Sequence, residues 1–381
     1  MKTKVLNSLE IHRFRGFKHL NIGHLGNINL IVGKNNVGKS SLLEALQLYA
    51  RRASPIVIAQ ILGTRDENKR QRSNRGSSFE ESLRAAKYLF YGRKEIKAPI
   101  KPISIGPINS LEDRLTLDVQ WFSKVSSVDG IGVLQKVLFE EYEALNDEYE
   151  APDTSTPRFT VQIGTQREYN YPLDMSSASS SIYARAIRLE IGEITNFFID
   201  ANGLNRKEVG ELWDSIALTS LEKEILAALR IVAPGVEDIS VIGDPTSSRE
   251  RVTIVKVVGI DEPLPIRSLG DGMQRMLGIA LALVNARNGI LLIDEIENGL
   301  HYSVQLDLWY LIFELARRLN VQVFATSHSW DCIKTFQTAA KEDEQLEGVL
   351  IRLEIKNGEV STTQFDEQEL AIATQEQIEV R

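Results

Sequence analysis

A glycine-rich segment near the start of the chain has the residue types and spacing to bind the phosphates of a nucleotide. Residues 33–40 read GKNNVGKS and match the phosphate-loop pattern G-x-x-x-x-G-K-[ST]. In such a loop the backbone N–H groups converge on the phosphates, Lys39 reaches the β- and γ-phosphates, and the Ser40 hydroxyl coordinates Mg²⁺. The residues predicted to bind ATP in this loop are Gly33, Lys34, Asn35, Asn36, Val37, Gly38, Lys39, Ser40 and Ser41.

A pair of carboxylates supplies the second half of a hydrolytic site. Asp294 and Glu295 directly follow the apolar run Ile290–Ile293. A carboxylate at the end of a buried strand beside a phosphate loop can hold Mg²⁺, so Asp294 is predicted to be a metal ligand together with Ser40. Glu295 is predicted to orient and activate the attacking water. ATP and Mg²⁺ are therefore the expected cofactors, and ATP hydrolysis to ADP and phosphate is the expected reaction.

Two further segments have polar residues at the ends of predicted apolar elements. Residues 268–275 read SLGDGMQR and precede a helical stretch, and Thr326, Ser327 and His328 follow an apolar stretch at 321–325. Taken alone, the first is explained by a helix N-cap with flexible glycines and the second by an ordinary surface or core histidine. Their order around the carboxylate pair favours a role in the site for both.

With these four segments in this order, the sequence resembles the ABC-type ATPases. Residues 268–275, called the signature segment below, correspond to the signature motif of that family, and His328 corresponds to its switch histidine. The resemblance implies a homodimer or higher oligomer in which Ser268, Gly270 and Gly272 of one subunit close over ATP bound by the other. It also implies that His328 donates a hydrogen bond to the γ-phosphate. The transporter sequence LSGGQ is absent and no Q-loop glutamine is identified, which argues against a transporter subunit.

Within the ABC-type group, the sequence is most similar to the SMC, RecF and OLD class of AAA-type ATPases. The similarity lies in the segments LEIHRFRGF at 9–17, GKNN at 33–36 and DEIENGLH at 294–301. It implies a DNA-linked function such as repair, chromosome organisation or phage defence. The stretch after His328 is too short for the Toprim nuclease that OLD-type proteins commonly carry, so a nuclease or other effector is expected as a separate partner.

The resemblance also places two parts of the chain near the shared site. It implies that residues 298–301 lie at the dimer seam and that Arg15 lies near the nucleotide; for Arg15, a solvated strand residue is an equally good interpretation. Two functions remain open. One is an ATPase that acts as a conformational switch, and the other is a nucleotide-gated scaffold that recruits an effector with little hydrolysis.

The elements that must position these residues follow from the apolar pattern. Strands are predicted at Leu9–Phe14, Ile28–Val32, Ile290–Ile293 and 321–325, with helices at 40–49 and 273–286 and another that contains Leu308 to Leu319. Weaker signals predict strands at 114–122 and 158–163 and a helix at 221–231. The fold class is α/β: a P-loop NTPase head like that of ABC ATPases, with a mixed sheet flanked by helices and a large α+β insertion. The expected division is residues 1–50 and 236–381 for the head and 51–235 for the insertion.

Composition narrows the classes of partner. The 381 residues are 43% hydrophobic and 25% charged, with a formal net charge of −8, so the chain as a whole has no electrostatic reason to bind nucleic acid. A basic loop from Arg65 to Arg75 can contact DNA phosphates, although a solvated loop is the favoured interpretation. The acidic stretch from Glu140 to Asp153 is either a solvated face or a surface for a basic partner.

The remaining signals concern location and thiol chemistry. No apolar run approaches the roughly 20 residues that span a bilayer, and the N-terminus lacks the apolar core of a secretory signal. A cytoplasmic protein without a membrane partner is therefore expected. The single cysteine, Cys332, is predicted to be a small buried hydrophobe without chemistry.

Overall fold

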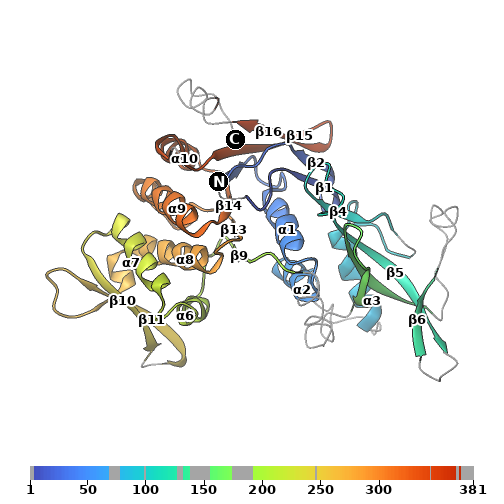
Figure 1. Ribbon diagram of the computed structural model, residues 1–381, viewed down its shortest axis with the longest axis horizontal. Coiled ribbons are helices and arrows are strands. Elements are labelled where there is room, and N and C mark those ends of the chain that lie inside the picture. Colours follow the sequence, from blue (N-terminus) through green and yellow to red (C-terminus); the bar gives the residue numbers. More distant parts are fainter. Residues whose placement is uncertain are drawn as a thin grey trace.

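The chain folds around a six-stranded mixed sheet that holds the predicted phosphate loop and carboxylates (Figure 1). The computed structural model describes residues 4–67, 78–97, 100–126, 132–137, 155–173, 192–244, 247–343, 345–365 and 369. The strand order of the sheet is β16-β15-β3-β14-β13-β9, and all neighbours are parallel except β15 and β16. These strands are β3 (Ile28–Val32), β9 (Asn196–Ile199), β13 (Ile290–Ile293), β14 (Gln322–Ser327), β15 (Gly348–Lys356) and β16 (Glu359–Phe365).

Helices cover both faces of this sheet, which explains why its central strands are apolar throughout. Every residue of β3, β13 and β14 is buried. Alternate side chains point to opposite faces, so Leu291 and Ile293 join one core while Ile290 and Leu292 join the other. The first core contains the helices α6 (Arg206–Asp214), α7 (Ser220–Val232), α8 (Asp271–Asn285), α9 (Gln305–Leu319) and α10 (Trp330–Glu342).

The second core lies between the mixed sheet and an antiparallel sheet, with α1 (Lys39–Ala50) between them. The antiparallel sheet has seven strands in the order β2-β1-β4-β5-β7-β8, with β6 paired to β5. Its strands are β1 (Leu9–Phe14), β2 (Phe17–Ile22), β4 (Ile103–Gly106), β5 (Leu115–Ser126), β6 (Gly132–Lys136), β7 (Ser155–Ile163) and β8 (Tyr169–Pro172). The helices on this side are α2 (Pro55–Thr64), α3 (Ser78–Ala86) and the 3-10 turn η1 (Lys87–Leu89).

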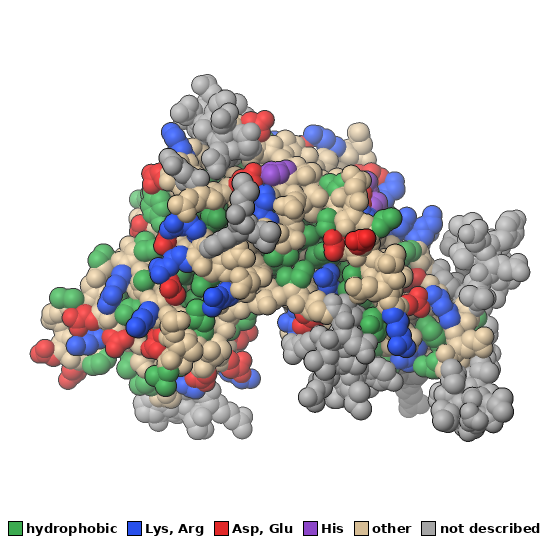
Figure 2. Space-filling model, viewed as in Figure 1, with side chains coloured by type: hydrophobic (Ala, Val, Ile, Leu, Met, Phe, Trp, Pro, Cys, Tyr) green, Lys and Arg blue, Asp and Glu red, His purple; other side chains and the backbone are tan. Residues whose placement is uncertain are grey.

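A small third sheet sits at the far end of the molecule, beside α6 and α7 (Figure 1). It consists of β10 (Val236–Asp244), β11 (Ser247–Val257) and β12 (Leu264–Pro265), all antiparallel. The 3-10 turn η2 (Ile266–Leu269) then leads into α8, and η3 (Tyr302–Val304) leads into α9. Over the lobe of α7, β10 and β11, basic and acidic side chains alternate on the face shown in Figure 2, so this face carries no patch of a single sign.

The α/β class and the mixed sheet flanked by helices are confirmed. The predicted division into 1–50, 51–235 and 236–381 stays a prediction, and β9, from within 51–235, pairs with β13 in the main sheet. Residues 68–75 of the basic loop and the whole acidic stretch from Glu140 to Asp153 lie outside the described residues. Among the described residues, no helix has the length and apolar character needed to cross a membrane.

Candidate nucleotide site

The phosphate loop joins the end of β3 to the start of α1, and two of its glycines have conformations that other residues rarely adopt. Gly33 has φ +147° and Gly38 has φ +111°. A Cβ at Gly33 would lie 2.5 Å from the Leu353 carbonyl oxygen, and one at Gly38 would lie 2.9 Å from the Phe17 ring. The glycines therefore let the chain turn tightly between two packed elements and enter the helix with its N–H groups exposed.

Lys39 is held across this loop by the loop's own backbone. Its side-chain Nζ donates to the carbonyl oxygens of Gly33 at 2.7 Å and Lys34 at 3.2 Å. Burial lowers the pKa of Lys39, while the nearby charges of Asp294, Glu295 and Glu297 act in the opposite direction. The fold thus brings the loop and the carboxylate pair to one end of the sheet.

A cavity of about 650 Å³ opens at this end of the sheet. Of the predicted residues, Asn35, Asn36, Val37, Gly38, Lys39, Ser40, Ser41, Asp294 and Glu295 line it. Gly33 and Lys34 lie at its edge and hold Lys39 through their carbonyl groups. The apolar side chains of Ile355 and Val360 reach the cavity from β15 and β16, so phosphate-binding and apolar surfaces adjoin.

Thr326, to which the sequence assigned no role of its own, holds the side chain of Asp294 and the backbone of Glu295. The Thr326 hydroxyl donates to Asp294 Oδ1 at 2.5 Å and accepts from the Glu295 N–H at 2.8 Å. Glu295 has φ +46°, a left-handed conformation that a non-glycine residue adopts only when its surroundings impose it. Ser40 and Asp294 present oxygen atoms of the kind that Mg²⁺ prefers, so the donor set in the cavity fits that ion.

We expect Thr326→Val to slow turnover roughly 10-fold or more, because both Asp294 and Glu295 lose the partner that orients them. The unfolding free energy should fall by about 1–3 kcal/mol, since partly buried polar groups of Asp294 and Glu295 lose their hydrogen bonds. Steady-state ATP hydrolysis and urea titration measure the two effects. Thr338→Val is the matched control, because the Thr338 hydroxyl bonds to the Lys334 carbonyl within its own helix, α10. Unchanged turnover in Thr326→Val would contradict the orienting role.

The switch-histidine position lies beside the cavity but does not line it. The His328 ring lies 3.3 Å from Glu297 Oε1 through Nδ1 and remains half exposed. The same Glu297 oxygen accepts from the His328 N–H and the Ser327 hydroxyl, both at 2.9 Å. Glu297 therefore fixes the backbone at the end of β14, and the role of His328 on a γ-phosphate stays a prediction.

The three residues of the signature segment predicted to meet ATP do not line the cavity of their own chain. Ser268 and Gly270 are exposed, and neither they nor Gly272 line the cavity. Gly270 has φ +105° with open space around it, and α8 begins directly after it. Within 298–301, the Asn298 side chain donates to the Ala201 carbonyl at 2.8 Å, and the side chains are mostly exposed.

Arg15 is one of the most buried charged residues of the described chain, so the solvated interpretation of this residue is wrong. Its guanidinium lies 2.5 Å from Glu44 and 2.9 Å from Glu67, and the residue lines the cavity. Arg65, the first residue of the predicted basic loop, lies 2.8 Å from the other oxygen of Glu44. The start of that loop is thus tied to α1 rather than free in solvent.

We expect Arg15→Met to destabilise the fold by about 3–5 kcal/mol, because it removes one of the two arginines whose charges compensate the buried Glu44. Burial raises the pKa of Glu44, while Arg15 and Arg65 act in the opposite direction. A carboxyl whose folded pKa is raised stabilises the fold at low pH and loses this contribution as pH rises through that pKa. Removing Arg15 raises the pKa of Glu44 in the folded protein further. The loss of unfolding free energy relative to wild type should therefore be larger at about pH 8 than at about pH 5.

Urea titrations at both pH values measure this difference, and Lys18→Met is the control because Lys18 and its partner Glu359 are exposed. Equal deficits at the two pH values would mean that Glu44 is not the group left uncompensated.

One element of the site that the sequence left unidentified is a strand beside β13. β9 pairs with β13 in parallel and ends at Ile199, and Asp200 then lines the cavity. Among the described residues no glutamine lines the cavity, and Asp200 presents a carboxylate there at the end of β9. The pattern of a short apolar strand followed by an acidic residue, NFFID at 196–200, is the signal that could have found it.

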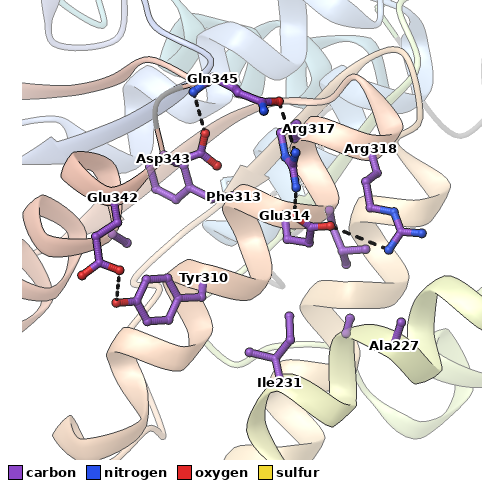
Figure 3. Close-up of a pocket in the computed structure, with 13 residues that line it drawn as sticks. Ala227, Ile231, Tyr310, Phe313, Glu314, Arg317, Arg318, Glu342, Asp343 and Gln345 are labelled. Atoms are coloured by element: carbon purple, nitrogen blue, oxygen red, sulfur yellow. Dashed lines mark hydrogen bonds and ion pairs between the residues drawn. The ribbon is translucent and has the colours of Figure 1, made fainter.

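Two other features carry no predicted chemistry. Cys332 is buried, and burial raises the pKa of its thiol to about 12. A cavity of about 760 Å³ between α7, α9 and α10 has polar groups that pair with one another, as in the bond of 2.7 Å from the Tyr310 hydroxyl to Glu342 (Figure 3). None of the residues predicted for catalysis lines this second cavity.

Comparison with known proteins finds similar chains of three kinds. An ATP/GTP phosphatase of Helicobacter pylori is 25% identical over 363 residues, which cover 89% of this chain and 90% of that protein. A protein of Methanocaldococcus jannaschii is 49% identical over 45 residues, 12% of this chain and 20% of its own length. The SMC head domain from Thermotoga maritima matches with a TM-score of 0.44 at 12% identity over 95% of this chain and 99% of that domain.

The family match spans most of the chain and includes the phosphate loop, both carboxylates, the signature segment and His328. It covers residues 28–331 and carries the description "AAA domain, putative AbiEii toxin, Type IV TA system". The resemblance to AAA-type ATPases is therefore confirmed, and the chain belongs to this AAA-domain family.

Proposed function

We propose that this chain binds ATP with Mg²⁺ and hydrolyses it to ADP and phosphate. The observation that carries the proposal is the single cavity lined by Lys39, Ser40, Asp294 and Glu295. The enzyme class is supported by family membership and by the similarity to an ATP/GTP phosphatase over almost the full length of both chains.

The residues of the cavity divide the work of phosphoryl transfer. The N–H groups at the start of α1 and the Lys39 ammonium group would bind the β- and γ-phosphates. Ser40 and Asp294 would hold Mg²⁺, which supplies charge neutralisation at the phosphates when it is bound. Glu295 would accept a hydrogen bond from the attacking water and aim it at the γ-phosphorus, while Thr326 keeps the Glu295 backbone in place.

The exposed residues Ser268 and Gly270 support a dimer that shares its two sites. Ser268 and Gly270 are exposed and do not line the cavity of their own chain, so the start of α8 can meet an anion bound to a second chain. A second copy bound head to tail would place them over its ATP. His328 and residues 298–301 would lie at the seam, and hydrolysis would open the dimer.

We place this switch in a DNA-linked or defence process that acts through a separate effector. The family description refers to a type IV toxin–antitoxin system, which supports defence. The lobe of α7, β10 and β11 carries interspersed charges on the face shown in Figure 2, which gives no support to DNA binding there. The candidate for duplex contact is the loop that begins at Arg65, whose basic residues would meet DNA phosphates.

Turnover and solution mass test the proposal together. The wild-type protein is assayed for phosphate release with Mg²⁺ and ATP or GTP, with and without duplex DNA, and its mass is measured in the same conditions. ATP-dependent dimers with turnover support the switch. Dimers without turnover would favour the nucleotide-gated scaffold. A protein that stays monomeric and does not hydrolyse ATP would contradict the proposed function. Turnover that does not change with DNA would remove DNA as the activating partner.

A further inference from the structure

Arg275, in the first part of α8, joins that helix to the ends of two strands of the nucleotide site. Its Nη1 donates to the Asp200 carbonyl at 3.2 Å, after β9. Its Nη2 lies 3.4 Å from the Asp294 carbonyl and 3.3 Å from the Glu295 carbonyl, after β13. One planar group therefore reaches three main-chain oxygens, each belonging to a residue whose side chain lines the cavity.

The turn after β9 is shaped to receive this guanidinium. Gly203 has φ +79°, and a Cβ at this position would lie 2.6 Å from Arg275 Nη1. A side chain at residue 203 would therefore displace Arg275 as well as strain the turn. Burial lowers the pKa of Arg275, and the charge of Asp200 acts most strongly in the opposite direction.

We propose that Arg275 is a positioning residue for ATP hydrolysis, which holds the Asp294–Glu295 backbone in register with Asp200 and with the start of α8. The inference deepens the proposed function and rests on it. Glu295 is in a left-handed conformation, so its carboxylate points correctly only while its peptide groups are held. Thr326 holds the Glu295 N–H, and Arg275 approaches the carbonyl groups on either side of that residue's Cα.

The position of Arg275 along α8 also links the start of this helix to Glu295. The helix begins after Gly270, and Arg275 lies about one turn further on. The glycines at this start are the groups proposed to meet ATP on a second copy of the chain. A shift of α8 on closure would therefore be passed through a rigid helix and a planar guanidinium to Glu295 of the same subunit.

Lysine cannot replace arginine in this role. An ammonium group is a compact point charge on a flexible stem, whereas the guanidinium presents several N–H groups in one plane. Arg275→Lys would keep the charge but could not reach the ends of both β9 and β13 together. Arg275→Met would remove the charge while keeping most of the packing of the side chain.

The test compares Arg275→Lys and Arg275→Met with Arg287→Met, in which an exposed arginine just beyond the end of the same helix is changed. We expect kcat for ATP to fall roughly 10- to 100-fold in both Arg275 variants, with KM within about 3-fold of wild type, as for loss of an orienting partner. Combined with Glu295→Gln, the Arg275 variants should still form ATP-dependent dimers. Millimolar guanidinium should partly restore kcat in Arg275→Ala and leave Arg287→Ala unchanged.

The outcomes separate this inference from the proposed function. If the wild-type protein did not hydrolyse ATP, both the proposed function and the positioning role of Arg275 would be contradicted. Wild-type turnover with Arg275 variants as active as Arg287→Met would overturn the positioning role alone. A parallel loss of melting temperature, ATP binding and dimer formation, without rescue by guanidinium, would also overturn it, since Arg275 would then only support the fold.

Discussion

Lys39→Ala is expected to reduce ATP turnover by about 100- to 1,000-fold, the usual cost of removing one preorganised charge from a transition state. The ammonium group is already held inside the loop by the carbonyl oxygens of Gly33 and Lys34, so little reorganisation is needed when phosphates arrive. Alanine leaves those oxygens facing the phosphates without a cation between them. Affinity for ATP should also fall, by about 10-fold or more, because a hydrogen bond to a charged group is lost.

Phosphate release and binding of a fluorescent ATP analogue measure the two effects, and a thermal melt checks that the variant is folded. Lys341→Ala is the matched control, since Lys341 is exposed on α10 and does not line the nucleotide cavity. If Lys39→Ala kept wild-type turnover, the loop at 33–40 would not be the phosphate site, whatever its sequence.

The sequence was sufficient for those parts of the site that are continuous along the chain. The run Ile28–Val32, the glycine-rich loop and the helix after it form one local unit, so their pattern predicts the geometry directly. The run Ile290–Ile293 is apolar because helices cover both faces of the sheet, and this burial predicts a central strand with Asp294 at its end. Both predictions rest on a pattern that is continuous along the chain.

The parts that could not be predicted depend on contacts between distant segments. Thr326 reaches Asp294 across two adjacent strands, and Arg275 reaches Asp200 from a helix 75 residues later in the chain. β9 is only four residues long, so its apolar signal is too short to be distinguished from a loop. Arg15 appeared equally compatible with solvent, because its partners Glu44 and Glu67 come from a helix and a loop end with no pattern that links them.

Glu295→Gln is expected to reduce turnover about 100- to 10,000-fold, the range found for loss of a general base, while ATP binding is retained. The change keeps the size of the side chain and its place in the cavity, and it leaves the Glu295 N–H bonded to Thr326. The variant loses the negative charge of residue 295 and with it the ability to accept a proton from water. Bound ATP should therefore persist, and the variant should accumulate as an ATP-dependent dimer if the signature segment closes over the second subunit's nucleotide.

The contrast between the two variants makes the assignment specific. Lys39→Ala should lose turnover and dimer formation together because ATP is bound poorly, whereas Glu295→Gln should lose turnover and gain dimer. Light scattering measures the mass of each variant with ATP and, for comparison, with ADP. Glu262→Gln is the control variant, because it removes an exposed carboxylate. A Glu295→Gln protein that turns over normally would assign water activation to another carboxylate, and Asp200 at the end of β9 would be the next to change because it lines the same cavity.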